Sequence, residues 1–513
     1  MTISASRRSF LSFSGLCTAT LAGSAELGFL SKLPALSAAQ VQLPSRLVDL
    51  NSGIEPLVRI IESSPRDTLL ELVASRIHQG TSYQEVLAAL FLAGVRNVQP
   101  RPAVGFKFHS VLVVHSAHLA SMASSNNDRW LPIFWALDYF KATQLEEEKQ
   151  SGWKMNAVAE DALPLASKAR ENFIQSMDEW DPEAADLSIA RLARSASQQD
   201  LFDLFCRFGA RDLRSIGHKA IFVANGFRTL NCIGWQHAEP VLRSLAFALQ
   251  NHEGDPNPAS SELETDQPYR ENVDNILSIR EDWLDGKLDP SATDFLLGRL
   301  SEASPSEVAR LSVEFLNKGI SPRSIWDAVY LGSGELLMRQ PGIVGLHTLT
   351  TANALHYAYQ TTTDESTRKL LLLQACSFVP MFYKSARLRG DVGTKSVRDV
   401  SESAKEVDTA NNVESVKQIF ELVSRDKPAA AQKLLSYLRA GGDAQQVMTR
   451  ARELVFLKGR DSHDYKFSSA ILEDYHHLSA SCKNEFLALS VFYLKGSEDT
   501  NSNLVERTRR AIA

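Results

Sequence analysis

The sequence predicts an all-α fold, a large helical-repeat toroid or solenoid built from about four related three-helix units. Apolar residues recur at three- and four-residue intervals in segments such as 69–77, 83–95 and 307–317, which is typical of amphipathic helices. No long alternating pattern of the kind that marks strands is present. A plan of helix, glycine, helix, loop, histidine and helix recurs along the chain, as repeat proteins require.

The four copies of this plan share a glycine after the first helix and a histidine before the third. The copies span residues 64–121, 199–249, 304–359 and 427–475. Their glycines are Gly80, Gly209, Gly319 and Gly441, and their histidines are His109, His237, His347 and His463. The glycine-to-histidine spacing is 29, 28 and 28 residues in the first three copies and 22 in the fourth.

Local signals fix where many helices begin and end. Ser64-Pro65, Ser304-Pro305, Ser321-Pro322 and Asp426 combine a capping side chain with a proline at or near a helix start. The repeat glycines suit a left-handed residue that closes a helix at its carboxyl end.

The chain divides into a leader, two pairs of repeats and a linker. We expect a twin-arginine signal peptide over 1–39, repeats one and two over 40–251, an acidic linker over 252–268, and repeats three and four over 269–513. The net charge of −6 over 513 residues, without a basic stripe, argues against a nucleic-acid partner.

The amino terminus carries the strongest targeting signal. Arg7 and Arg8 precede Phe10 and Leu11, and an apolar stretch runs on to the small residues at 37–39. This stretch contains several serines and threonines, so it is too polar for a comfortable membrane span. We therefore expect the export machinery as a partner, a periplasmic or otherwise exported location, and no stable membrane span after cleavage. A Sec signal or an amino-terminal membrane anchor is the alternative.

The repeated histidines predict a metal centre. Imidazole is the commonest protein ligand for transition metals, and the positive end of a helix keeps the ring in its neutral, metal-binding form. We expect His109, His237, His347 and His463 to converge, with His218 as a fifth ligand that the other copies lack. A site rich in imidazole favours iron or copper, and then zinc. The alternative is that each histidine caps a helix or packs in a polar layer.

The second copy holds the remaining candidate site residues. Lys219, Arg211, Arg228 and Trp235 are expected to line a substrate cleft or hold an anion. The competing interpretation is a buried ion-pair network that joins the arginines to Asp212 and Glu239.

Two histidine-headed segments resemble the questin oxidase-like family. They read FHSVLVVHSAHLA over 108–120 and GLHTLTTANALHYAY over 345–359. The resemblance implies a helical fold and the oxidative ring opening of aromatic polyketides, in a family associated with NADPH. No nicotinamide-binding motif is visible in this chain.

Together these features predict an exported, metal-dependent oxidoreductase that acts on a small organic substrate. Two alternatives remain open at this point. One is a non-enzymatic helical scaffold or binding protein, and the other is a zinc hydrolase that uses the same histidines.

Overall fold

The computed structural model describes residues 53–100, 107–126, 128–250, 256–404, 412–502 and 504–505. Within these ranges the protein is all-α: helices α3 to α24 are joined by short 3₁₀ turns, and a single bridge between Lys287 and Ile320 is the one strand-like contact. The predicted fold class is thus confirmed at this level. The predicted signal peptide lies outside the described residues.

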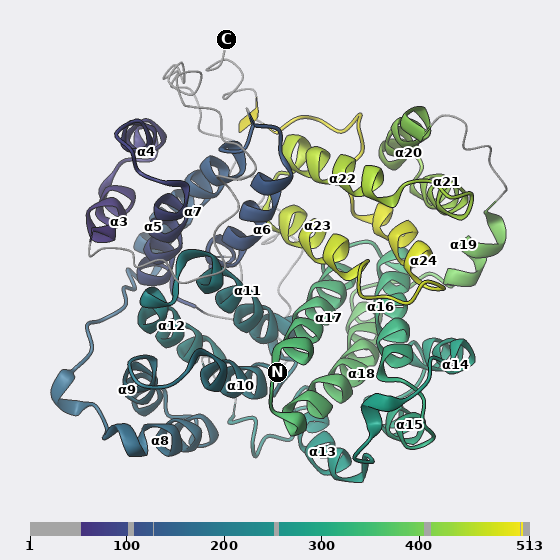
Figure 1. Cartoon of the computed structure of the whole chain (residues 1–513), viewed down its shortest axis with the longest axis horizontal. Coiled ribbons are helices and arrows are strands. Elements are labelled where there is room, and N and C mark those ends of the chain that lie inside the picture. Colours follow the sequence, from purple (N-terminus) through teal and green to yellow (C-terminus); the bar gives the residue numbers. More distant parts are fainter. Residues whose placement is uncertain are drawn as a thin grey trace.

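Four helices form the centre of the molecule: α6 (His109–Ala123), α11 (His218–Ile233), α17 (Ile343–Thr361) and α23 (Ser462–Asp474). Helices α6 and α17 each pack against both α11 and α23, so the four close a ring around the middle of the view in Figure 1. Most residues of α11 and α17 are buried. A helix that is surrounded on all sides loses the polar face of an ordinary surface helix, which explains the long apolar runs in these segments.

A second layer of helices surrounds this ring. Each inner helix packs against chain neighbours on its outside, and the outer helices also contact one another, α5 with α12, α10 with α18 and α16 with α24. The outer helices in contact with the ring are α5 (Tyr83–Asn97), α7 (Leu131–Gln150), α10 (Gln198–Gly209), α12 (Ala238–Gln250), α16 (Pro322–Arg339), α18 (Glu365–Arg387) and α22 (Ala444–Lys458). The remaining helices are α3 (Ile54–Ser63), α4 (Leu69–His78), α8 (Ala166–Glu179), α9 (Pro182–Ala193), α13 (Gln267–Asn275), α14 (Pro290–Leu300), α15 (Pro305–Asn317), α19 (Val397–Ser403), α20 (Asn412–Arg425), α21 (Lys427–Arg439) and α24 (Lys483–Leu489).

The capping predictions hold at three of four positions. The side chains of Ser304, Ser321 and Asp426 accept backbone N–H groups at the starts of α15, α16 and α21. The prediction for Ser64-Pro65 was wrong, because α4 begins at Leu69 after a turn at residues 65–68. Ser64 instead closes α3, where its hydroxyl donates to the carbonyl of Ile60.

The repeat glycines do not all serve the same purpose. Gly80, Gly319 and Gly441 have φ values of 102°, 79° and 85°, as the helix-ending prediction requires. Gly209 is the last residue of α10 and is absent from the positive-φ positions. A Cβ atom there would lie 2.8 Å from Cγ2 of Val223, so this glycine permits the close approach of α10 to α11.

The described part of the predicted acidic linker is anchored rather than free. Asp266 is fully buried and forms an ion pair with Arg214 at 2.5 Å. Helix contacts between α11 and α17 also join the two predicted halves of the chain. Among the described helices, none combines the length and apolar character needed to cross a bilayer.

Candidate metal centre

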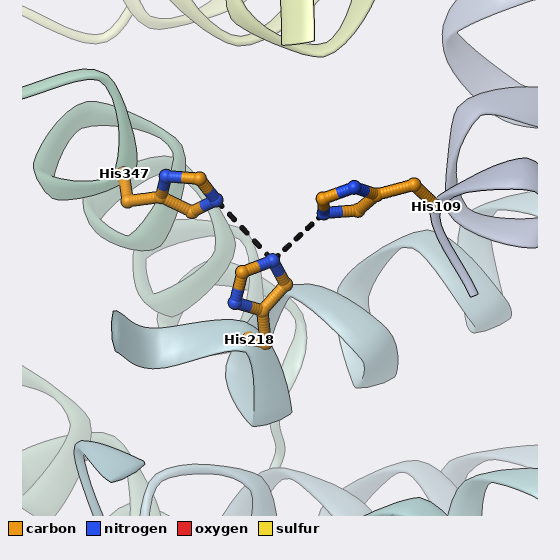
Figure 2. A group of neighbouring side chains, drawn as sticks. All are labelled: His109, His218 and His347. Atoms are coloured by element: carbon orange, nitrogen blue, oxygen red, sulfur yellow. Dashed lines mark hydrogen bonds between the residues drawn. The ribbon is translucent and has the colours of Figure 1, made fainter. Parts of the chain in front are cut away.

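Three histidines from three inner helices meet at the centre of the ring. His218 Nε2 lies 2.8 Å from His109 Nε2 and 3.2 Å from His347 Nε2 (Figure 2). One ligand atom from each ring lies within 4.8 Å of the other two, and all three residues are buried. His109 and His218 are the first residues of α6 and α11, and His347 follows the first residue of α17, Ile343, by one turn. This group has the composition and the spacing to hold one metal ion.

The tautomers of two of these rings leave their lone pairs facing each other. His218 Nδ1 is 2.5 Å from the carbonyl oxygen of Ser215, and His347 Nδ1 is 2.7 Å from that of Ile343. A carbonyl oxygen only accepts hydrogen bonds, so each Nδ1 carries the proton and each neutral ring presents a bare Nε2. Two bare nitrogens at 3.2 Å repel unless a cation or an additional proton lies between them.

Burial argues against that additional proton. Burial, and after it the positive charge of Lys466, lowers the pKa of His218 to about 3. Burial also holds the pKa values of His109 and His347 well below their ordinary value. The amino-terminal ends of the helices act in the same sense, since their dipoles disfavour imidazolium.

The observed spacing is close to that of a real metal site. Two nitrogens that each bind zinc at about 2.0–2.1 Å with a tetrahedral angle lie about 3.3–3.4 Å apart. The 3.2 Å separation of His218 from His347 matches this, and the 2.8 Å separation from His109 needs a small outward shift of one ring. In metal-binding histidines, the ring nitrogen that does not face the ion usually donates to a backbone carbonyl or a carboxylate, as Nδ1 does in His218 and His347.

His463 completes the group from the fourth inner helix. Its ring centroid lies 4.7 Å from that of His109 and 5.3 Å from that of His347, with both contacts edge-on. Asp461 Oδ1 is 3.4 Å from His463 Nδ1, while the buried Nε2 has no hydrogen-bond partner. This pairing of a carboxylate with one nitrogen and a free second nitrogen is what a metal-ligating histidine requires.

His237 does not join the group, which corrects our expectation for the second copy. It ends the short turn after α11, whereas His218 opens the same helix. At about 1.5 Å per residue, the helix separates their backbones by roughly 20 Å or more, so the two cannot bind one ion. The inner helix of this copy therefore begins with His218, and the expected convergence of His237 with the other histidines was wrong. His237 Nε2 is buried without a partner at its own position.

A tight turn aims His218 at the centre. Ser215 and Ile216 both have positive φ values, 54° and 51°, which are uncommon for residues with a side chain. Gly217 follows at 79°, and a Cβ atom there would lie 2.2 Å from the hydroxyl oxygen of Thr351 on α17. The turn places the Ser215 carbonyl against the imidazole, so backbone strain is coupled directly to the orientation of a ligand.

Lys219 forms a buried ion pair beside that turn, and Arg211 lies near it, 3.7 Å from a carboxylate oxygen of Asp178. Lys219 Nζ is 2.7 Å from a carboxylate oxygen of Asp212, and the side chains of both residues are at most 1% exposed. Asp212 also accepts the backbone N–H of Arg214. The cationic groups of Lys219 and Arg211 lie 4.9 Å and 5.1 Å from the ring centroid of Trp180. Asp212 thus takes part in a buried ion pair, as the ion-pair alternative predicted. Glu239, which that alternative also included, instead pairs with Arg194.

Arg228 and Trp235 lie at different places. Arg228 is on α11 and forms a two-pronged ion pair with Glu473 on α23, both contacts at 2.8 Å. Trp235 is half-buried in the turn after α11 and packs against Phe227. Lys219, Arg211, Arg228 and Trp235 therefore do not meet as one cluster, and of the four only Arg228 lines the cavity described next.

Below the histidines, the four inner helices enclose a small polar cavity of about 20 Å³. Its polar wall includes His115 from α6, Asn225 and Arg228 from α11, Asn353 from α17, and Lys466 and Glu473 from α23, together with the hydroxyl residues Ser116, Thr350 and Ser469. These residues follow the ring histidines by one to three helical turns. The volume is sufficient for one water molecule or a molecule of similar size.

Lys466 and Asp461 are the site residues that the sequence interpretation missed. A signal for Asp461 was present, since it precedes His463 by two residues and caps α23. Lys466 follows His463 by one helical turn, so it had to share a helix face with it. The other copies have no aspartate two residues before the histidine and no lysine three residues after it, so the repeat pattern does not single these two residues out.

Comparisons of the chain with protein-family models, curated proteins and solved structures give no match. The resemblance to the questin oxidase-like family consequently stays a prediction.

Proposed function

We propose that this protein is an exported, metal-dependent oxidoreductase that uses one first-row transition metal ion. His109, His218 and His347 supply three ligands, and His463 supplies a fourth. The facing lone pairs of His218 and His347 carry the metal part of this proposal, because a cation resolves their repulsion and ordinary packing does not.

Iron or copper fits this donor set better than a hard cation. Neutral imidazoles suit iron, copper, nickel and zinc, whereas magnesium and calcium require oxygen ligands. Redox chemistry is favoured over hydrolysis by the enclosure of the centre. A hydrolytic zinc needs its substrate at an open coordination position, and the adjoining cavity of about 20 Å³ has no space for an ester or a peptide.

The same volume argues for a substrate smaller than the organic molecule we expected. A species of one or two heavy atoms, such as dioxygen, fits beside the histidines without movement of the helices. An aromatic polyketide requires the inner helices to separate. The resemblance of residues 108–120 and 345–359 to an oxidative family supports the oxidative class of reaction, and the cavity limits the size of the reactant.

We also propose that the ring is a fourfold repeat of three-helix units. In the first, third and fourth units the inner helix is the third, as in α4, α5 and α6. The second unit keeps this order if it consists of α9, α10 and α11, one helix earlier than we first aligned it. In that register, His109, His218, His347 and His463 all lie near the start of a third helix.

Metal analysis of the purified full-length chain tests the proposal. We expect about one equivalent of iron or copper, and a spectroscopic signal that changes on treatment with a reductant. His218→Ala should lower the metal affinity at least about 100-fold, because the variant removes the nitrogen that lies between the other two. His237→Ala is the matched control, since His237 flanks the same helix at its other end, and it should retain the metal.

The outcome of that experiment separates the alternatives. Full thermal stability without metal would overturn the metal centre and favour a helical scaffold. A tightly bound zinc without redox activity would favour a structural ion, for which the complete burial of the ligands is the supporting observation.

Export is a separate part of the proposal and rests on Arg7 and Arg8. Replacement of both by lysine should retain the protein in the cytoplasm, and cell fractionation would measure it. Undiminished export of that variant would contradict the twin-arginine route.

A further inference from the structure

A buried lysine without a partner, Lys466, lies below the histidines. This lysine is on α23, 3% exposed, and its Nζ atom has no hydrogen-bond partner. It lines the polar cavity that all four inner helices enclose. A buried amine without an acceptor costs free energy whether it is charged or neutral, so its retention in the core calls for a partner that the protein chain does not supply.

The other cation of this cavity is already neutralised. Arg228 Nη2 contacts both carboxylate oxygens of Glu473, and Arg228 Nη1 donates to the side-chain oxygen of Asn353. Asn353 in turn donates to Glu473 and to Asp474. These hydrogen bonds occupy the guanidinium of Arg228, whereas the amine of Lys466 has no direct partner and interacts only at longer range with the carboxylate of Asp461.

Lys466 is the group in this cavity that can attract an anion. The positive dipole ends of the four inner helices lie at the histidine group, one to three turns above the cavity wall, so they contribute little field there. Burial lowers the pKa of Lys466 to about 7, which leaves the amine ready to gain a proton when an anion arrives. A divalent ion on neutral imidazoles would add further positive charge with no compensating carboxylate among its ligands.

We propose that this cavity binds a small monovalent inorganic anion, such as a halide, held by the side chain of Lys466. The size of the cavity selects this class of ligand. A volume of about 20 Å³ accepts one or two heavy atoms, which excludes phosphate, sulfate and a carbonyl substrate that would condense with the lysine. A water molecule satisfies the hydrogen bonds of the amine but leaves its charge unmatched.

The site does not depend on the proposed metal, because Lys466 lacks a partner whether or not the histidines hold an ion. Bromide is a suitable probe, since it binds transition metals weakly and scatters X-rays anomalously. Crystals of the full-length chain grown in bromide should show an anomalous peak beside Lys466 Nζ, both after removal of metal with a chelator and in the protein as purified. Peaks confined to the protein surface would overturn the proposal.

A solution measurement gives the second test. At millimolar concentrations and equal ionic strength, where the general stabilising effect of sulfate is small, bromide should raise the melting temperature of the metal-free protein more than sulfate does, because sulfate is too large to enter. Lys466→Met keeps the length of the side chain and removes its charge. It should lose this bromide-specific increase and bind bromide at least tenfold more weakly.

Lys141→Met provides the matched control. Lys141 is also buried, but its amine contacts the carbonyl oxygens of Ile61 and Glu62 and the side-chain oxygen of Gln144, away from the cavity. This variant should keep the bromide-specific response. An equal response in Lys466→Met and the unmodified protein would contradict the anion site, while the metal content would still report separately on the histidine centre.

Discussion

Two buried lysines on the inner helices have opposite surroundings. Lys219 follows His218 on α11, and Lys466 follows His463 by one turn on α23. They are 0% and 3% exposed, yet Lys219 contacts Asp212 at 2.7 Å and Lys466 Nζ has no partner. A buried charge with a partner belongs to the scaffold of the site, and a buried donor without one marks a place for a ligand.

The paired lysine supports the metal centre indirectly. Asp212 joins Lys219 to the backbone of Arg214, and Arg214 begins the turn whose Ser215 carbonyl orients His218. The charged residues of the second copy therefore hold His218 in position. The unpaired groups, Lys466 Nζ and His463 Nε2, lie on a different inner helix, α23.

Acidification should lower the free energy of unfolding more than any other change, because it acts on the buried histidines of the inner helices. Burial lowers the pKa of His118 to about 4 and those of His218 and His356 to about 3. Below pH 6.5 these histidines bind protons in the unfolded chain but stay neutral in the folded chain. The free energy of unfolding therefore decreases as the pH is lowered, until the folded-state pKa values are reached. At about 1.36 kcal/mol per pH unit per group, these three histidines together cost about 6 kcal/mol at pH 5.

Denaturant titrations of the metal-free protein at pH 7.5, 6.5 and 5 would measure this loss. His356→Asn removes one of the three groups and should make the decline between pH 6.5 and pH 5 shallower. A free energy of unfolding that stays constant over this interval would contradict the neutral, buried state of the histidines.

Substitution of the two lysines should have the next largest effect on stability. The substitution of Lys219 should destabilise the protein, whereas that of Lys466 should not. Lys219→Met leaves the Asp212 carboxylate buried beside fewer cations and should destabilise the protein by about 3–5 kcal/mol. Lys466→Met removes an amine that has no partner and should be neutral or stabilising in the absence of small anions. The denaturation midpoints of the two variants, compared with that of the unmodified metal-free protein, test the contrast directly. Equal losses would remove the distinction between a scaffold lysine and a ligand-binding lysine.

Removal of the fourth imidazole should have the smallest effect. His463 contacts His109 and His347 edge-on, but it lies outside the group of three whose ligand atoms are mutually within 4.8 Å. We expect His463→Ala to weaken metal binding about tenfold, which corresponds to about 1.4 kcal/mol. Competition with a chromophoric chelator would measure the affinity. A loss as large as that of His218→Ala would make His463 an equal ligand.

The sequence predicted most of what is local in this protein. Helical periodicity and the caps at Ser304, Ser321 and Asp426 depend on residues within one or two turns, so a linear search finds them. Of the predicted ligands, His109, His218 and His347 lie together in the buried group, and the ring of His463 lies beside them. The error at His237 arose because equal spacing cannot tell which of two consecutive helices turns inward.

The sequence by itself determined the helices and the inventory of histidines that begin them. Tertiary structure alone decided which histidines meet, because His218 lies 109 residues from His109 and 129 from His347, and only the packing of the inner helices brings them together. It also decided which lysine is paired. Helix formation is a matter of neighbouring residues along the chain, whereas ligand geometry and the matching of buried charge depend on contacts between helices that are remote in sequence.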